Sequence, residues 1–212
     1  DGAMDSKRTV FVVDDDIAAR ESIVDIVRLK ACQAQGFASA EEFLAQYDPQ
    51  QKGCLVVDVR MSGMSGLDLL LELKSRKSSL PVVMITGYGD VALAVKAMRA
   101  GAVSFLEKPC REAELWHEIR QALEIEQTEH ARRKHRSDVE ARLASLTDEE
   151  VVVLRRLLEG HPNKRIASDM DLGLRTVEMR RSNVMRKMQA ASMAELVRMA
   201  ILAEFLNPES SS

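Results

Sequence analysis

Three short stretches of almost uninterrupted apolar residues in the first half of the chain most strongly limit what it can fold into. They are Thr9–Val13, Cys54–Val57 and Val82–Ile85. Runs of this length without polar alternation are typical of central parallel strands that helices cover on both faces. Weaker strands are predicted at Cys32–Phe37 and Val103–Leu106.

Amphipathic helical patterns separate these strands. The predicted helices are Ala18–Leu29, Glu41–Gln46, Leu67–Ser75 and Val91–Ala100. Ser39 and Glu42 form a capping-box pattern at the start of the second helix, and Gly101 ends the last one. The sequence therefore predicts an α/β fold with a doubly wound five-stranded parallel sheet, which binds ligands at the carboxyl ends of its strands.

Charged and hydroxyl side chains stand at these carboxyl ends. They are Asp14 and Asp15 after the first strand, Asp58 at the end of the third, Thr86 at the end of the fourth, and Lys108 after the fifth. Three carboxylates in one pocket repel each other unless a cation compensates them, and their hard oxygens suit Mg²⁺. A hydroxyl and an ammonium beside them would bind a phosphoryl group. Asp16 is not needed for this site.

The character of the chain changes after Pro109. Residues 111–143 contain seven Lys or Arg and eight Asp or Glu, with no Pro or Gly before Gly160. Leu115, Ile119 and Leu123 have helical spacing, so we expect a helix that closes the first domain and continues into a charged, semi-rigid helical linker. The predicted domain boundaries are residues 5–123, 124–143 and 144–208. The first four residues are expected to be a cloning remnant.

The last third of the chain predicts only helices. Thr147 and Glu150 form a capping box, and a short helix follows at Asn163–Met170. Gly173 separates this helix from a longer one at Arg175–Met188, and Ser192 with Glu195 caps a final helix that reaches Phe205. Two short helices joined by a tight turn containing Gly are typical of a helix-turn-helix, within an all-α four-helix domain.

The segment Arg175–Met188 is strongly basic, although the whole chain has a net charge of −3. Val177, Val184 and Met188 share one face and are expected to pack inside the domain. The opposite face would present Arg175, Glu178, Met179, Ser182, Asn183 and Arg186, with Arg180 and Lys187 at its flanks. Such a face suits DNA, although a solvated basic helix remains the alternative. Arg181 lies nearer the packed face, where we expect it to pair with a helix carboxylate.

The first half of the chain resembles the receiver domain of response regulators, especially the FixJ-like subgroup. The segments that match are VVDDD, VVDVRMSGMSG, ITGYGDVALAVKAMRAGA and SFLEKP, and the resemblance covers about residues 7–125. It implies that Asp58 accepts a phosphoryl group from a sensor histidine kinase. It also implies that Mg²⁺ is held by Asp14, Asp15, Asp58 and the backbone carbonyl of Arg60.

The same resemblance implies a switch. Lys108 would pair with the phosphoryl group, Thr86 would move to hydrogen-bond it, and Phe105 would rotate inward. A plain core aromatic is the alternative for Phe105. Ser62 stands where the family usually has proline, so a more mobile loop is expected after Asp58, and Cys110 replaces a common aromatic, which would loosen packing.

Residues 145–206 resemble the LuxR/NarL-type helix-turn-helix, on the segments SLTDEEVVVLRRLLEGHPNKRIASDM, TVEMRRSNVMRKM and SMAELVRMA. The resemblance implies that Arg175–Met188 is the recognition helix. Arg180 replaces the usual histidine and Gly173 a common serine, so the target sequence is not predicted. The candidate DNA contacts are Asn163, Lys164, Arg175, Thr176, Glu178, Met179, Arg180, Ser182, Asn183, Arg186 and Lys187.

These features together predict a cytoplasmic two-component transcription factor and not an enzyme. The expected partners are a sensor histidine kinase, double-stranded promoter DNA and a second copy of the chain after phosphorylation, with RNA polymerase a further candidate. No apolar run approaches the roughly 18 residues of a membrane helix, and no signal peptide precedes the first strand, so no membrane partner is expected.

Two other functions were weighed against this one. A Mg²⁺-dependent phosphatase would need a second carboxylate two residues after Asp58, where Arg60 stands and cannot act as a general acid. A redox sensor would use Cys54 or Cys110, but neither has a basic neighbour placed to lower its pKa. We expect all three cysteines to be reduced thiols.

Overall fold

The computed structural model describes residues 8–87 and 91–205. The predicted cloning remnant at residues 1–4 and the outermost residues of the predicted domains, 5–7 and 206–208, lie outside the described residues. The chain divides into two compact units, residues 1–130 and 131–212. Among the described residues, no helix is both long and apolar enough to cross a membrane.

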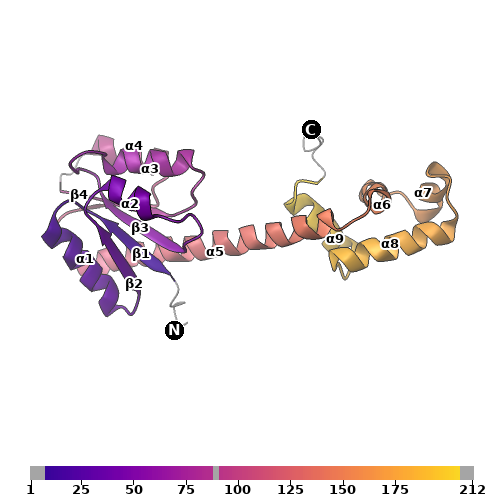
Figure 1. The fold of residues 1–212 in the computed structure, drawn as a ribbon, viewed down its shortest axis with the longest axis horizontal. Coiled ribbons are helices and arrows are strands. Elements are labelled where there is room, and N and C mark those ends of the chain that lie inside the picture. Colours follow the sequence, from indigo (N-terminus) through magenta and orange to yellow (C-terminus); the bar gives the residue numbers. More distant parts are fainter. Residues whose placement is uncertain (1–7, 88–90, 206–212) are drawn as a thin grey trace. The chain divides into compact units, whose positions relative to one another are not determined.

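A five-stranded parallel sheet forms the centre of the N-terminal unit (Figure 1). Its strands are β1 (Thr9–Val13), β2 (Gln33–Phe37), β3 (Gly53–Asp58), β4 (Val82–Thr86) and β5 (Ser104–Glu107), in the spatial order β2-β1-β3-β4-β5. The helices between them are α1 (Ile17–Leu29), α2 (Ala40–Gln46), α3 (Gly66–Ser75) and α4 (Val91–Ala100). This arrangement confirms the predicted doubly wound fold.

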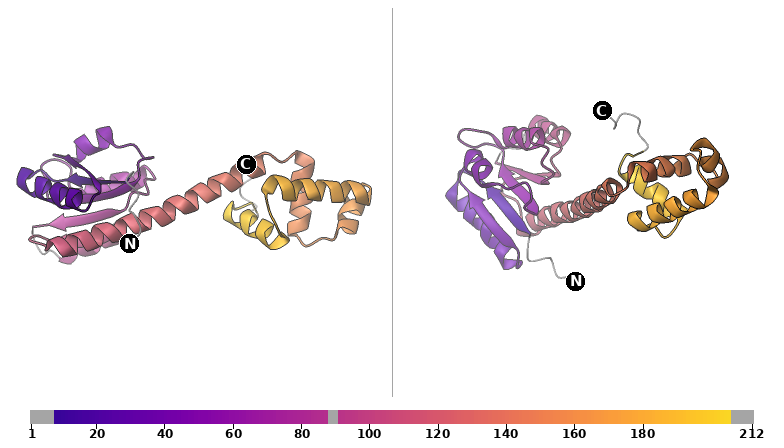
Figure 2. Two further views of the ribbon diagram at one scale, coloured as in Figure 1. Left: turned by 90° about the horizontal axis from the view of Figure 1, so that it is seen from below. Right: turned by 45° about the vertical axis from the view of Figure 1, so that its right-hand side comes forward.

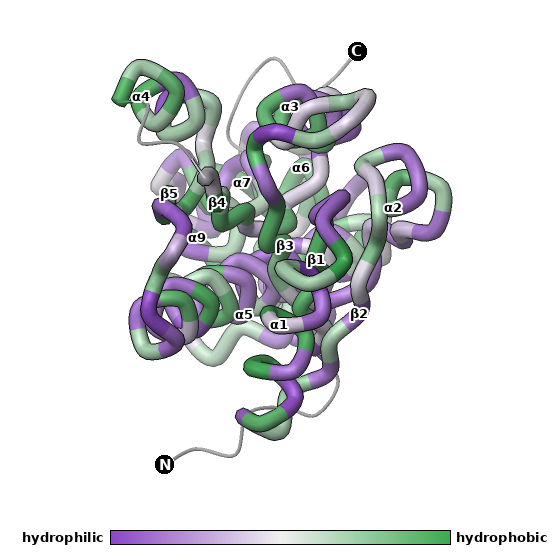
Figure 3. Tube along the Cα trace, turned by 90° about the vertical axis from the view of Figure 1, so that its left-hand side faces the viewer, coloured by the Kyte–Doolittle hydropathy of each residue, from purple (hydrophilic) through white to green (hydrophobic). Residues whose placement is uncertain are grey.

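Helices cover both faces of the sheet, as the apolar strand sequences require (Figure 3). On one face, Phe11 and Leu55 pack with Phe43 of α2 and Leu69 of α3. On the other face, Val12 of the next register packs with α1 and with the first part of α5 (Glu112–Ala144). Successive strand residues therefore enter opposite cores, because side chains alternate along a strand.

Side-chain caps fix where several of these helices begin. Asp16 accepts a hydrogen bond from the Ala19 amide at 2.9 Å and caps α1. Ser39 caps α2 as predicted, and Ser65 forms a capping box with Asp68 at the start of α3. Asp16 thus has a structural role as a helix cap, next to the two aspartates predicted to bind metal.

The C-terminal unit consists of the last part of α5 and four further helices (Figure 2). These are α6 (Asp148–Leu158), α7 (Asn163–Asp169), α8 (Leu174–Met188) and α9 (Met193–Leu202). Val139 of α5 is fully buried against Leu154, Val184 and Leu196. The segment Glu124–Arg142, expected to be helical, is helical throughout because it lies inside α5.

Lys187 lies in a position other than the one expected from the sequence. Its ammonium group donates to the Glu150 carboxylate at 2.6 Å and to the Ser145 carbonyl at 3.0 Å. Glu150 is only 5% exposed and also accepts the Thr147 amide at 2.9 Å, as part of the α6 capping box. The expectation that Lys187 contacts DNA phosphate is therefore revised, because its charge is used to hold α8 on the start of α6.

Arg181 also differs from expectation. Its guanidinium group donates to the side-chain oxygen of Asn163 at 3.1 Å, so its partner is an amide and not a helix carboxylate. The bond connects α8 to the first residue of α7. Arg181 therefore has the structural role that was predicted, with a different partner.

We predict that Lys187→Ala lowers the midpoint of thermal unfolding by roughly 5 °C at pH 7, because Glu150 loses its charged partner. Lys187 is the main cause of the lowered pKa of Glu150. The contribution should thus be complete above the usual pKa of glutamate and disappear as the pH falls through the lowered value. Lys164→Ala, which removes an exposed lysine of α7, is the control and should not change the midpoint.

Candidate functional site

Two buried carboxylates and one ammonium group meet at the carboxyl ends of the strands. Asp14 follows β1 and is 2% exposed, and Asp58 ends β3 and is 7% exposed. Lys108, directly after β5, donates to Asp14 Oδ2 at 2.6 Å and to Asp58 Oδ1 at 2.7 Å. Residues up to 94 positions apart in the sequence thus form one charged cluster, because parallel strands end at the same edge.

The electrostatics of the cluster have two opposing parts. Burial raises the pKa of the Asp58 carboxyl, and Lys108 opposes this effect by hydrogen bonding and by its charge. Burial also acts to lower the pKa of Lys108, but its bonds to Asp14 and Asp58 outweigh burial and raise it. The ammonium group is therefore held in its charged form, where it can compensate the two carboxylates.

Asp15 does not join this cluster directly. Its Oδ2 accepts both the backbone amide and the hydroxyl of Ser62, each at 2.8 Å. These two bonds are the main reason for the lowered pKa of Asp15. Among the residues that the structure describes, no three acidic, His or Cys side chains are gathered as metal ligands. The expected convergence of Asp14, Asp15 and Asp58 is thus incomplete in this arrangement.

The loop between β3 and α3 is held by carboxylates at every second residue. The amides of Arg60, Ser62 and Met64 donate at 2.8, 2.8 and 3.0 Å. Their acceptors are Asp58, Asp15 and Glu41, respectively. These bonds argue against the more mobile loop that was expected from Ser62. Proline at this position could not form the middle bond, because it has no backbone N–H.

Glycine is needed where this loop returns to the sheet. A Cβ atom on Gly66 would lie 2.3 Å from the backbone carbonyl oxygen of Asp58. The Gly66 amide donates to the Val59 carbonyl at 3.1 Å, which keeps the start of α3 close to the end of β3. A larger residue would therefore push on the backbone of Asp58 itself.

Thr86 and Phe105 lie on the neighbouring strands β4 and β5. Thr86 is fully buried, and its backbone carbonyl accepts the Lys108 amide at 2.7 Å. Phe105 is partly buried and packs against the core on the side of α3 and α4. On α4, Val91, Val95 and Met98 are large apolar side chains exposed to solvent. A surface of exposed apolar residues therefore lies on the element that follows β4.

The cysteines lie in surroundings that oppose redox chemistry. Burial strongly raises the pKa of the Cys54 thiol, which lies in the centre of the sheet. Burial also raises the pKa of Cys32 and Cys110. All three are free thiols, and a raised pKa keeps them in the less reactive protonated form.

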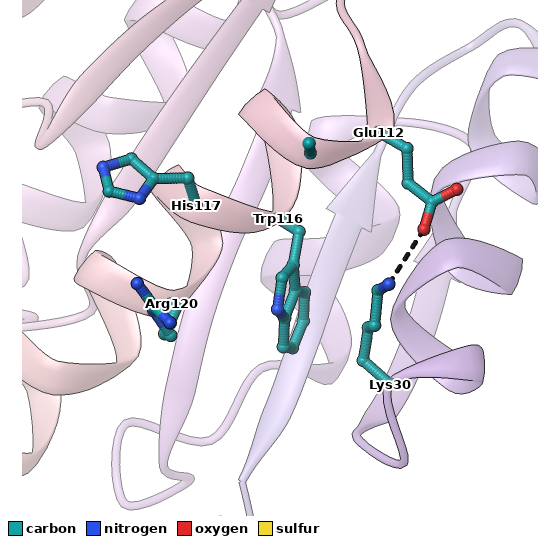
Figure 4. Close-up of a pocket in the computed structure, with 6 residues that line it drawn as sticks. Lys30, Glu112, Trp116, His117 and Arg120 are labelled. Atoms are coloured by element: carbon teal, nitrogen blue, oxygen red, sulfur yellow. Dashed lines mark ion pairs between the residues drawn. The ribbon is translucent and has the colours of Figure 1, made fainter. Parts of the chain in front are cut away.

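A shallow pocket lies where the end of α1 approaches the start of α5 (Figure 4). Trp116 forms its floor, and Lys30 and Glu112 form an ion pair of 3.0 Å at its edge. None of the predicted site residues lines it. The pocket is thus separate from the acidic cluster.

Helix α8 shows the predicted division into two faces. Val177, Val184 and Met188 are fully buried. The residues exposed on the other side are Arg175, Glu178, Met179, Ser182 and Arg186. Met179 is 57% exposed, which is unusual for a large apolar side chain at the centre of a polar face.

The remaining candidates for DNA contact have partners within the unit. Arg180 lies 3.9 Å from Glu149, a loose ion pair, and Arg186 donates to Asn183 at 3.3 Å. Asn163 holds Arg181, Thr176 is half-buried near the start of α8, and Lys164 is exposed on α7.

Sequence reasoning missed three residues that shape these sites. Ser62 was noted only as a departure from a family pattern, and Glu41 and Glu150 only as parts of capping patterns. A carboxylate that receives donors from a distant loop leaves no local sequence signal. The capping box at Thr147 was the one available hint that Glu150 is fixed in place.

Comparison with known proteins places both units in established families. A family model described as "Response regulator receiver domain" matches residues 10–120. A second model, described as "Bacterial regulatory proteins, luxR family", matches residues 144–200. Receiver domains generally bind Mg²⁺ at their phosphorylation site, and response regulators are phosphorylated by sensor kinases and bind DNA.

Several relatives resemble the chain over most of its length. The transcriptional regulatory protein FixJ of Azorhizobium caulinodans is 45% identical over 194 residues, which cover 92% of each chain. The response regulator protein TodT of Pseudomonas putida is 39% identical and covers 92% of this chain and 86% of its own.

Solved structures agree with this assignment. The response regulator StyR has a TM-score of 0.85 at 38% identity, covering 92% of this chain and 98% of its own. Full-length FixJ from B. japonicum has a TM-score of 0.58 at 40% identity, covering 96% and 100%. The chain therefore belongs to the FixJ-like response regulators, two-component transcription regulators in which a receiver domain precedes a LuxR-type DNA-binding domain.

Proposed function

We propose that a sensor histidine kinase phosphorylates Asp58 and that this modification controls dimerisation and sequence-specific DNA binding. The observation that best supports the proposal is the position of Lys108, which bridges Asp14 and Asp58 at the carboxyl edge of the sheet. An ammonium group beside a buried carboxylate can compensate the charge of an incoming phosphoryl group.

The chemical step would be a phosphoryl transfer. A carboxylate oxygen of Asp58 would form a bond to phosphorus while the bond from phosphorus to the imidazole nitrogen of the kinase histidine breaks. Lys108 would remain paired with the negative oxygens of the transferred group. The amide of Arg60, which donates to Asp58 Oδ2 at 2.8 Å, keeps the carboxylate oriented toward the edge of the sheet.

The residues present fit Mg²⁺. Two buried carboxylates share a single ammonium group, and their oxygens together with those of Asp15 are the hard ligands that this ion prefers. Asp14, Asp15, Asp58 and the backbone carbonyl of Arg60 would hold it. When bound, Mg²⁺ would neutralise charge on the phosphoryl oxygens. Lys108 would then no longer need to bridge both carboxylates.

The signal would leave the site through β4 and β5. A new hydrogen bond from Thr86 to the phosphoryl group would draw this buried residue toward Asp58, and Phe105 would move into the space released. Both residues adjoin α4, whose exposed Val91, Val95 and Met98 would form the contact between two copies. A dimer would bring two recognition helices to adjacent DNA half-sites.

The DNA contacts would come from α8 and the start of α7. Exposed side chains of α8 would meet base edges, and Arg180 at its flank would meet phosphate. The proposed contacts are Asn163, Lys164, Arg175, Thr176, Glu178, Met179, Arg180, Ser182, Asn183 and Arg186. Such a regulator would act in the cytoplasm, with RNA polymerase as a candidate partner at the promoter.

Asp58→Asn should abolish phosphorylation by acetyl phosphate and Mg²⁺, because the amide lacks the nucleophilic charge. The intact mass of the full chain measures this as loss of a single phosphoryl addition. Asp16→Asn is the matched control, since asparagine also caps a helix well, and it should be labelled normally. Stoichiometric labelling of Asp58→Asn would falsify the assignment.

A phosphoryl mimic such as beryllofluoride should tighten the dimer about tenfold or more. Val95→Glu should remove this gain, because it places charge in the exposed apolar surface of α4. Sedimentation equilibrium with and without the mimic measures both effects. Leu71→Glu, at an exposed leucine of α3, is the control and should keep the gain. Equal dimer affinity with and without the mimic would contradict coupling through dimerisation.

Two substitutions in α8 should have different effects on DNA binding. Arg180→Ala should weaken specific and random duplexes alike and lower the salt dependence by about one unit. Ser182→Ala should keep the salt dependence and relax preference at one base position, at a cost of about 1–3 kcal/mol. Titrations over a salt series with selected and scrambled duplexes measure both effects. If Arg180→Ala spares random DNA, α8 does not bind in this orientation.

A further inference from the structure

We infer that Ser62 is a positioning residue that restrains Asp15 while no metal is bound and so sets the Mg²⁺ affinity of the receiver. The inference rests on the proposed function, since it concerns the same site. It starts from the position of Ser62 in the loop after Asp58, where the receiver pattern usually has proline.

The contact between Ser62 and Asp15 uses two donors on one oxygen. The backbone amide and the hydroxyl of Ser62 each lie 2.8 Å from Asp15 Oδ2. Proline would supply neither donor, and alanine would supply only the amide. The contact joins the turn after β1 to the loop after β3, 47 positions apart in the sequence.

The loop is built to hold Ser62 in this position. The amide two residues before it donates to Asp58 at 2.8 Å, and the amide two residues after it donates to Glu41 at 3.0 Å. Ser62 is thus fixed from both sides, and its donors cannot follow the Asp15 carboxylate freely if that carboxylate turns toward a metal.

The restraint competes with metal binding and does not prepare it. A carboxylate oxygen has two lone-pair sites, and both sites of Asp15 Oδ2 are used by Ser62. Among the described residues no three ligands are gathered, since Asp14 and Asp58 share Lys108 and Asp15 faces the loop. Asp15 must therefore give up at least one bond to Ser62 before this oxygen can bind Mg²⁺.

Calorimetric titration of the full chain with Mg²⁺ alone tests the inference. Ser62→Ala removes one donor and should raise the affinity for Mg²⁺ roughly threefold, and Ser62→Pro removes both and should raise it about tenfold. Ser62→Thr keeps both donors and should bind Mg²⁺ as the wild type does. The alanine and threonine variants decide the question even if the proline variant does not fold.

Ser75→Ala is the matched control, because Ser75 donates to Glu72 at the far end of α3 and should leave Mg²⁺ affinity unchanged. Unfolding midpoints in the presence of a chelator should agree among wild type, alanine and threonine variants, which separates metal affinity from stability. Equal or weaker Mg²⁺ binding by Ser62→Ala would overturn the inference and leave phosphorylation of Asp58 intact. Absence of Mg²⁺ binding in every protein would overturn both.

Discussion

The bridge that Lys108 forms between Asp14 and Asp58 is the interaction on which the rest of the N-terminal unit depends. Two carboxylates that are less than a tenth exposed cannot remain charged side by side without a cation. Lys108 supplies that charge at 2.6 and 2.7 Å. The parallel sheet makes the bridge feasible, since it brings the ends of three separate strands to one edge.

Around this bridge, the loop after Asp58 acts as a frame made of backbone amides. Arg60, Ser62 and Met64 each direct an N–H group to a different carboxylate, and Gly66 lets the chain return within van der Waals distance of Asp58. Each carboxylate comes from a different part of the unit. A change at one acidic residue is thus connected to its neighbours through the loop and not only through charge.

In the C-terminal unit, basic side chains of one helix divide between structure and recognition. Lys187 and Arg181 hold α8 on α6 and α7 through Glu150 and Asn163. Arg175 and Arg186 stay exposed, as does Met179. The net positive charge of α8 therefore overstates what is available to DNA, because part of it compensates a buried carboxylate within the unit.

The sequence by itself determined the fold class, the site at the strand ends and the buried face of α8, since these follow from apolar periodicity and from where strands end. Even the capping residues at Ser39 and Thr147 were predictable, because caps are local. Only the tertiary structure decided which partner each charged side chain takes. Asp15 pairs with Ser62, and Lys187 with Glu150, across 47 and 37 positions. Long side chains reach whatever acceptor the packing brings near them, and no local pattern encodes that proximity.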